Sequence, residues 1–548
     1  MKTLIQTSRY LAITVLIACF FSTSLFSQGE KKSDLKFKVS FTNEAHQDNI
    51  TGRIYVMISK NNNREPRSQI GLTGVPFWGK NIFSLKPGES GVIDDEVFGY
   101  PLESIADIPA GEYYVQAFIN LYTEFKRSDG HTLWMHNDQG EGQSWRRSPG
   151  NMYSDVKKVN IDPSKAQTIE LSCSTVIPPI PPKADTKWVK RIKIKSKLLS
   201  DFWGQPIYIG ATILLPKNYD RNTNKHYPVN YIQGHFSSGA PYGFRDNNDQ
   251  GNSRGRSNIS EYWKSDECPE MLAITLLHPC PYYDDSYVVN SPNVGPYDDA
   301  IMKELIPHLE EQFRIIKEPY ARILSGGSTG GWISLAMQVF HPDFFGGTFS
   351  LCPDPVDFHY HQIVNIYEDK NAYFKEYEWM KVERPNTRGT DGNIRTTMEN
   401  ENLYELVVGD KSRSGGQWDI WEAAYSPIGE DGYPKRIWNK RTGEIDNEVA
   451  KEWEKFDIHH YLKENWSTIG PKLEGKLFIY TGSMDSYYLN NAVVLLEDYL
   501  NKTKYPYYDG KIEYGLRKPH CWGPRGKDLI KLMGDQVAKN APSGTGIN

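Results

Sequence analysis

The stretch Ser325-Gly326-Gly327-Ser328-Thr329-Gly330-Gly331-Trp332 decides the fold of the larger part of this chain. It follows the largely apolar run 321–324 and precedes the apolar run 333–340, so it predicts a strand, a tight turn and a helix. Its Gly-x-Ser-x-Gly spacing is typical of a nucleophile elbow, where a serine sits in a strained turn between two elements that nearly touch. An ordinary glycine-rich turn is the alternative. Because the pattern lies between a strand and a helix, we predict Ser328 as a nucleophile.

An activated serine needs a histidine base and a carboxylate that orients that base. Behind a nucleophile elbow the three groups follow in the order serine, acid, histidine. His520 is the only histidine after residue 461, and it lies between the strand-like run 511–514 and a predicted terminal helix. We therefore predict His520 as the base, with a plain loop histidine as the alternative.

The acid is expected just beyond the predicted strand 476–480. Asp485 is the first carboxylate after that strand. A turn aspartate that binds local amides is the alternative interpretation of Asp485. Asp498 and Asp509 fall in the following predicted helix and its trailing loop, so they are placed less well.

Two backbone amides are predicted to form an oxyanion hole. The N–H of Thr329 lies at the start of the predicted helix and points to where negative charge develops. The second donor is expected in the turn Gln233-Gly234-His235-Phe236, where we predict the N–H of His235. For the His235 side chain, lining the site and a purely structural role both stay open.

The composition and the N-terminal sequence indicate which partners and which cellular location the chain can have. Its 548 residues suggest two or three domains, and 63 basic against 68 acidic side chains, without a long basic run, do not favour nucleic acid as a partner. Residues 1–27 combine a basic start with a short apolar core, which predicts a signal peptide and a secreted or periplasmic protein. The alternative is a lipoprotein, because 16–19 resembles a lipobox ending in Cys19. No integral membrane span is predicted.

The mature chain would hold five cysteines, Cys173, Cys268, Cys280, Cys352 and Cys521. Cys268 and Cys280 bracket the predicted strand 271–277 and are able to pair, although the sequence leaves the connectivity open. Since no two of the five have Cys-x-x-Cys spacing, we predict no metal centre, and the expected chemistry needs no organic cofactor.

The hydrophobic pattern divides the chain into two domains and a linker. Residues 28–175 show strands without helices, which predicts an all-β sandwich of immunoglobulin-like shape. Within it the polar and aromatic region 131–147 is interpreted as a solvated loop, with contact to substrate or to another domain as the alternative. The proline-rich segment 176–185 is a stiff linker, and 186–548 form the second domain.

In the second domain, short buried strands alternate with helices, which is typical of an α/β sheet. Between the predicted strands 348–351 and 476–480 lies an insertion of about residues 354–470, which we predict to be a cap over the substrate pocket. Its aromatic side chains either form a surface for sugar or phenolic groups or pack the cap against the sheet; they are Trp418, Trp421, Tyr425, Trp438, Trp453 and Trp466.

At these residues the second domain resembles the esterase D type of α/β-hydrolase, a group that includes feruloyl, acetyl-xylan and enterochelin esterases. The resemblance covers roughly 190–350 and 475–535 and rests on the segments 214–220, 227–229, 295–297, 303–307, 327–331 and 341–345. It implies an α/β-hydrolase fold with a mostly parallel sheet. Two features depart from the family: Gln233-Gly234 stands where His-Gly is usual, and the insertion is longer than the norm.

Together these features predict a secreted serine carboxylic-ester hydrolase that acts on small-molecule or polysaccharide esters, through Ser328, His520 and Asp485. Alternatives are a siderophore esterase of the enterochelin type, a peptidase on the same fold and a non-catalytic glycan-binding protein. An intact serine, acid and histidine argue against the last.

Overall fold

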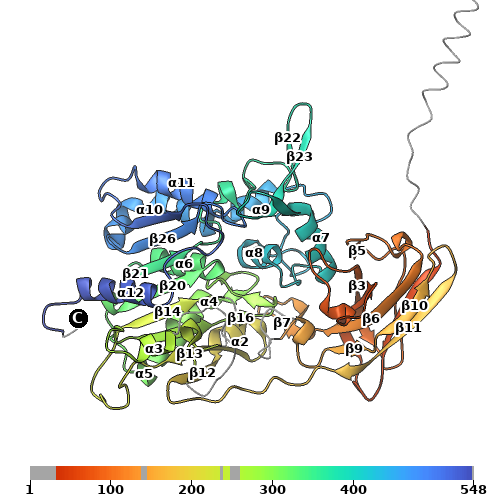
Figure 1. Ribbon diagram of the computed structural model, residues 1–548, viewed down its shortest axis with the longest axis horizontal. Helices are drawn as coiled ribbons and strands as arrows, with labels where there is room; N and C mark the ends of the chain where they lie inside the picture. Colours follow the sequence, from red (N-terminus) through yellow and green to blue (C-terminus); the bar gives the residue numbers. More distant parts are fainter. Residues whose placement is uncertain (1–31, 138–144, 235–238, 247–258, 546–548) are drawn as a thin grey trace, which may run out of the picture.

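The computed structural model describes residues 32–137, 145–234, 239–246 and 259–545 (Figure 1). Two large sheets lie side by side, a nine-stranded one from the N-terminal part and an eight-stranded one from the remainder. Cap elements run above and between them in Figure 1. Within the described ranges, no helix is both long and apolar enough to cross a membrane.

The first sheet is built from the N-terminal part of the chain, whose described residues 32–137 and 145–176 hold strands and short 3-10 turns but no α-helix. Its hydrogen-bonded order is β4-β1-β11-β9-β6-β2-β3-β5, and β10 also pairs with β6. The strands are β1 (Leu35–Phe41), β2 (Ile50–Ser59), β3 (Phe77–Leu85), β4 (Gly91–Ile93), β5 (Gly99–Tyr100), β6 (Gly111–Leu121), β9 (Met152–Ser154), β10 (Lys157–Ile161) and β11 (Gln167–Val176), with β7 (Thr123–Lys126) and β8 (Thr132–Met135) as a separate hairpin. The immunoglobulin-like shape stays a prediction.

Strand β2 is buried along its whole length because both of its faces are covered. We call the nine-stranded sheet and its connections, within the described residues of 32–176, the β-unit. Ile54 and Val56 join its core, whereas Tyr55 and Met57 pack in a second cluster that includes Val407 from the cap. This explains why β2 lacks the alternation of buried and exposed residues that a half-buried strand shows. The predicted linker lies in the largely exposed segment between β11 and β12 (Val189–Ser196), which holds no helix or strand.

The second sheet has the order β12-β13-β15-β14-β20-β21-β26-β27. Strands β12 and β13 are antiparallel to their neighbours and the remaining pairs are parallel, so the sheet is mostly parallel, as the family resemblance implies. The further strands are β13 (Ile207–Leu214), β14 (Val229–Gln233), β15 (Leu272–Leu277), β20 (Arg322–Gly327), β21 (Gly347–Leu351), β26 (Leu477–Gly482) and β27 (Lys511–Gly515). Their apolar runs are buried because helices cover both faces.

Helix α6 (Thr329–Phe340) is buried from its first residue to Val339. It packs on β14, β20 and β21 and against α10 (Ile458–Leu473) of the cap. On the opposite face, α3 (Ile259–Lys264) and α12 (Lys527–Asn540) share a separate apolar cluster with Phe349. The segment 297–312 forms α4 (Tyr297–Ala300), the π-helical turn Ile301–Leu305 and α5 (Ile306–Gln312).

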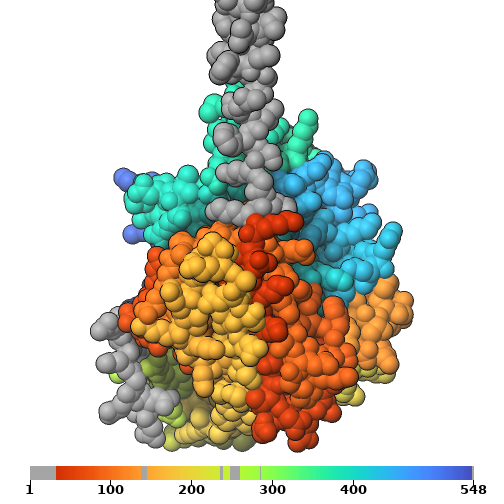
Figure 2. Space-filling model, turned by 90° about the vertical axis from the view of Figure 1, so that its right-hand side faces the viewer, coloured from red at the N-terminus to blue at the C-terminus, as the bar shows by residue number. Residues whose placement is uncertain are grey.

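The insertion between β21 and β26 packs against the β-unit. It contains the hairpins β22–β23 (Phe374–Glu376, Lys381–Glu383) and β24–β25 (Pro385–Arg388, Ile394–Thr397), and the helices α7 (Met398–Val408), α8 (Gln417–Tyr425), α9 (Asn447–Glu452) and α10. Helix α7 contacts β3 and β5, and Arg53 of β2 donates from Nε to the carbonyl of Val407 at 3.0 Å. In Figure 2 the β-unit faces the viewer, and teal and blue segments lie above it on either side.

Two interpretations from the sequence need correction. The region 131–147 is not simply a solvated loop: Trp145 is buried and stacks on Tyr55 at 4.6 Å, and the Trp134 carbonyl accepts a hydrogen bond from Arg413 of the cap at 2.7 Å. The region therefore contacts another part of the chain, which was the alternative interpretation. Residues 138–144 of this region lie outside the described residues.

Cys268 and Cys280, the pair considered from the sequence, are both free thiols. They stand at opposite ends of β15, and a strand of six residues separates its ends by roughly 20 Å. That separation exceeds the reach of a disulfide.

Candidate active site

Ser328 lies in a strained turn between β20 and α6. Its backbone has φ 59° and ψ −125°, a positive φ that a residue with a side chain adopts at a cost. The flanking glycines make the turn possible: a Cβ on Gly326 would lie 2.2 Å from the Gly330 carbonyl oxygen, and one on Gly330 would lie 2.2 Å from that of Gln233. The glycines that the sequence pattern singles out are therefore required by close contact between β14, β20 and α6.

The structure brings the three predicted side chains together. The His520 Nε2 atom is 3.0 Å from the Ser328 Oγ atom, and the His520 Nδ1 atom is 2.7 Å from Asp485 Oδ2. The three residues follow β20, β26 and β27, and parallel strands place their carboxyl ends at one edge of a sheet. Asp485 is fully buried, and its Oδ1 accepts from the N–H of Tyr487 at 2.9 Å. Asp485 thus binds the imidazole and a local amide at once, so the contacts expected of an orienting carboxylate and those of a turn aspartate are both present.

The charge state of His520 is set by its neighbours. Burial lowers the pKa of its imidazole, but the hydrogen bonds to Asp485 and to Cys521 outweigh burial and raise the pKa to about 10. The carboxylate therefore stabilises an imidazolium, which is the form that a general base takes after it removes a proton.

A polar cluster beside Ser328 is absent from the sequence predictions. Asp354 lies just after β21, with Oδ1 3.4 Å from the Ser328 Oγ atom. Its Oδ2 accepts from Tyr287 Oη at 2.6 Å and from Thr329 Oγ1 at 2.9 Å. The cap joins this cluster, because Gln417 of α8 donates from Nε2 to Tyr287 Oη at 2.5 Å. One signal was available: Asp354 is the first carboxylate after its strand, as Asp485 is after β26.

The oxyanion hole stays a prediction. Thr329 is the first residue of α6 and is buried next to Ser328, so its amide belongs to the helix N-terminus, as expected. Gln233 ends β14 beside the elbow, and Gly234 follows it. His235, the second predicted donor, lies outside the described residues.

The aromatic side chains of the cap are packing residues, which was one of the two alternatives. All six are buried: Trp418 lies 4.7 Å from Trp421 and 4.4 Å from Trp438, Tyr425 lies 5.3 Å from Trp453, and the Trp466 ring lies against Tyr499 instead. His361 is enclosed among them, and burial lowers its pKa to about 3, so it is neutral. An aromatic ring that does reach the site is Tyr487, which is 37% exposed and lies edge-on to His520 at 5.0 Å.

The cap also supports the acid directly. Arg388 of β24 donates from Nε to the Asp485 carbonyl oxygen at 2.9 Å, and its guanidinium lies over the Tyr488 ring at 4.2 Å. The loop that carries the acid is therefore held by the cap as well as by β26. This contact joins residues about a hundred positions apart, and no local pattern predicts it.

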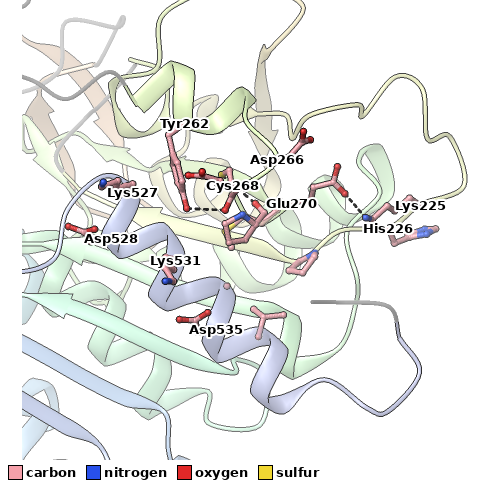
Figure 3. A pocket seen from close by; sticks show the side chains of 16 residues that line it. Lys225, His226, Tyr262, Asp266, Cys268, Glu270, Lys527, Asp528, Lys531 and Asp535 are labelled. Atoms are coloured by element: carbon pink, nitrogen blue, oxygen red, sulfur yellow. Dashed lines mark hydrogen bonds and ion pairs between the residues drawn. The ribbon is translucent and has the colours of Figure 1, made fainter.

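A cavity of about 720 Å³ lies away from these residues. It is enclosed between α12 and the segment that leads into β15, near the amino ends of β14 and β15 (Figure 3). Its lining mixes both signs of charge, including an ion pair between Lys225 and Glu270 and the side chains of Lys527 and Asp528. None of Ser328, Asp485 and His520 lines it, so we do not assign the reaction to this cavity.

Residues 207–402 match the family model described as putative esterase. Three similar solved structures are a ferulic acid esterase (13% identity, 64% of this chain and 96% of that chain, TM-score 0.36), FphF, a fluorophosphonate-binding serine hydrolase of Staphylococcus aureus (13%, 64% and 98%, TM-score 0.34), and the S-formylglutathione hydrolase FrmB of the same species (13%, 64% and 99%, TM-score 0.33). No curated protein matches the chain.

The family match confirms the resemblance to esterases that the sequence indicates. It covers β13 to the start of α7, including Ser328, whereas Asp485 and His520 lie beyond it. It supports an α/β-hydrolase fold with a mixed sheet and the activity of a carboxylic ester hydrolase.

Proposed function

We propose that this carboxylic ester hydrolase works through a serine acyl-enzyme, with Ser328 as nucleophile, His520 as general base and acid, and Asp485 as the orienting carboxylate. The observation that carries the proposal is the continuous chain from Ser328 Oγ to His520 Nε2 at 3.0 Å and from His520 Nδ1 to Asp485 Oδ2 at 2.7 Å. Both distances lie within hydrogen-bond reach, which proton transfer requires.

The reaction proceeds in two displacements. Ser328 Oγ attacks the ester carbonyl carbon while its proton passes to His520 Nε2, and the alcohol leaves with that proton. Water then attacks the acyl-serine, gives one proton to His520 and releases the acid as Ser328 regains its hydrogen. Asp485 stabilises the imidazolium in both steps, and the amides of Thr329 and His235 are proposed to bind the oxyanion.

The proposed substrate is a carbohydrate-linked or similar hydroxyl-bearing ester. The support is Asp354, an almost fully buried carboxylate whose Oδ1 lies 3.4 Å from the Ser328 Oγ atom. A carboxylate accepts hydrogen bonds from hydroxyl groups and repels a second carboxylate, so it favours neutral polyhydroxy groups near the reacting carbonyl. We also propose export, through the signal peptide 1–27 or as a lipoprotein at Cys19; both lie outside the described residues.

The test compares substrates on the purified chain. We expect hydrolysis of p-nitrophenyl acetate and of acetylated or feruloylated glycans, and covalent labelling of Ser328 by a serine-directed phosphonate probe, located by peptide mapping. Labelling at another residue contradicts the nucleophile assignment. Faster cleavage of peptide amides than of esters at equal concentration favours the peptidase alternative, and binding of glycans without any turnover favours the glycan-binding one.

A further inference from the structure

Two cysteines lie against the imidazole of His520. Cys352 directly follows β21, and Cys521 directly follows His520 in the chain. Their sulfur atoms and a ring nitrogen of His520 all lie within 4.8 Å of one another. Cys521 also touches the elbow, because a Cβ on Gly327 would lie 3.5 Å from its Sγ atom. The reactive end of the sheet therefore holds a pair of neighbouring thiols that the ester chemistry does not use.

The two thiols differ in environment, as a reactive pair requires. Cys352 is fully buried, and burial raises the pKa of its thiol well above the usual value. Cys521 is partly exposed; the hydrogen bond from Cys352 lowers its pKa most, burial opposes this, and the contact with His520 lowers it further, to about 5. A partly exposed thiolate beside a buried thiol is the arrangement in which one sulfur attacks an external disulfide and the other completes the exchange.

The same thiolate affects the base. Cys521 and Asp485 both stabilise the imidazolium form of His520, and a protonated imidazole cannot accept the proton of Ser328. The other polar groups around this cluster are Tyr487, whose ring lies 5.0 Å from His520, Asp354, next to Ser328, and Arg525, which donates to the Cys521 carbonyl. Asp485 and Cys521 both act on the His520 ring. Of these two, only Cys521 loses its negative charge when it is oxidised to a disulfide.

We propose that Cys352 and Cys521 form an oxidisable dithiol, that it closes to a disulfide, and that the closed form is the more active esterase because the thiolate no longer competes with Ser328 for His520. The effect on activity rests on the proposed function; the bond itself does not. In the reaction, the Cys521 thiolate attacks a small-molecule disulfide and releases one thiolate. The Cys352 thiol then attacks the mixed disulfide, releases the second thiolate and loses its proton to solvent. The protein loses two electrons and, because Cys521 starts as a thiolate, one proton; the small disulfide is reduced to two thiolates, which take up protons from solvent.

The first measurement locates the bond in the purified full-length chain. After treatment with oxidised glutathione, we expect the intact mass to fall by about 2 Da, two fewer thiols to react with a thiol reagent in denaturant, and a linked peptide to contain Cys352 and Cys521. The variant Cys352→Ser should stop at the glutathione adduct on Cys521. The control Cys268→Ser, which removes a buried thiol outside the pair, should still form the linked peptide. If mapping finds no Cys352–Cys521 link, the dithiol proposal is overturned.

The second measurement compares oxidised and reduced wild-type protein, so that folding of a variant does not enter. Loss of the thiolate lowers the pKa of His520, and we expect the acid limb of the pH profile of kcat/KM to move to lower pH after oxidation. Below that limb, the rate rises about tenfold for each unit by which the pKa falls. An acid limb at the same pH in both forms overturns the effect on the base. If neither form hydrolyses any ester, the proposed function fails, while the mapped link still decides whether the bond exists.

Discussion

The eight-stranded sheet and the cap hold their polar side chains in opposite ways. At the carboxyl ends of β20, β26 and β27, Ser328, Asp485 and His520 meet at one partly open edge. Inside the cap, Lys440 is enclosed and pairs with Glu405 at 2.9 Å and with Asp419 at 3.0 Å. Groups at strand ends are able to reach a substrate, whereas enclosed ion pairs join α7 and α8 to the rest of the cap. We infer that chemistry resides at the sheet edge and that the cap's polar interior is scaffold.

The largest effect is expected at the sheet edge, from Ser328→Ala. Removal of the hydroxyl deletes the atom that forms the acyl-enzyme, so kcat on p-nitrophenyl acetate should fall by about 10⁴- to 10⁶-fold with the fold retained. The control is Ser334→Ala in α6, the helix that follows Ser328; the Ser334 Oγ donates to the Gly331 carbonyl at 3.0 Å. That variant should keep most of its activity. If kcat of the Ser328→Ala protein stayed within tenfold of wild type, Ser328 would not be the nucleophile, and the sheet edge could not be distinguished from the cap as the place of the chemistry.

Next in size is Asp485→Asn. An amide in this position cannot hold the required tautomer of His520 or offset its positive charge, and kcat should fall by about 10⁴-fold. The matched control is Asp498→Asn in α11 (Asn490–Leu500), one of the alternative acids considered from the sequence. Steady-state kinetics on one small ester decide between them. If kcat fell equally in both variants, the contact between Asp485 and His520 would not identify Asp485 as the orienting acid.

These two regions also differ in what the sequence could predict. Ser328, Asp485 and His520 could be predicted because each follows a strand that the sequence pattern indicates, and a local motif or the order serine, acid, histidine along the chain marks it. Asp354 follows its strand in the same way, but a serine triad needs only one carboxylate, so the pattern gives no reason to single out a second. The contacts of Arg388 with the acid loop and of Cys352 with Cys521 join segments far apart in the chain, so local patterns do not reveal them.

The cap aromatics show the same limit, because spacing alone cannot distinguish a ring that binds substrate from one that packs. Trp421 is 1% exposed and lies 4.4 Å from the His361 ring, whereas Trp379, at the tip of the β22–β23 hairpin, is 89% exposed. We expect Trp421→Ala to lower the free energy of unfolding by about 3–5 kcal/mol, because it leaves a cavity in the cap. The control Trp379→Ala should change it by less than about 0.5 kcal/mol.

Kinetics on the same two variants separate packing from substrate binding. If Trp421 only packs, the folded fraction of Trp421→Ala should lose activity on acetate esters and on bulky glycan esters in the same proportion. A selective loss on the bulky ester, with stability close to wild type, would return this ring to the substrate surface and weaken the distinction between sheet edge and cap.

The smallest effect is expected where the cap meets the β-unit, at Asp410. Its carboxylate pairs with Arg413 and accepts from Asn81 Nδ2 at 2.5 Å, which joins a cap loop to β3. Burial raises the pKa of Asp410, but the charges of Arg413 and Arg53 outweigh burial and lower it from 3.8 to about 2. Because the pKa in the folded protein is lower than in the unfolded chain, the carboxylate stabilises the fold above about pH 4, and this contribution is lost as the pH falls through 2.

Asp410→Asn should therefore lower the free energy of unfolding by about 1–2 kcal/mol at pH 7, and the difference from wild type should shrink as the pH falls from 4 towards 2. Urea unfolding at a series of pH values measures it. The control is Asp431→Asn, since the Asp431 side chain is 54% exposed and pairs with Lys411 at 3.2 Å; an exposed pair contributes less than about 1 kcal/mol. A pH-independent difference for Asp410→Asn would mean that shape and hydrogen bonding, rather than charge, hold the cap to the β-unit. The junction between cap and β-unit would then be stabilised mainly by packing, as the aromatic interior of the cap is, and not by ion pairs such as those of Lys440.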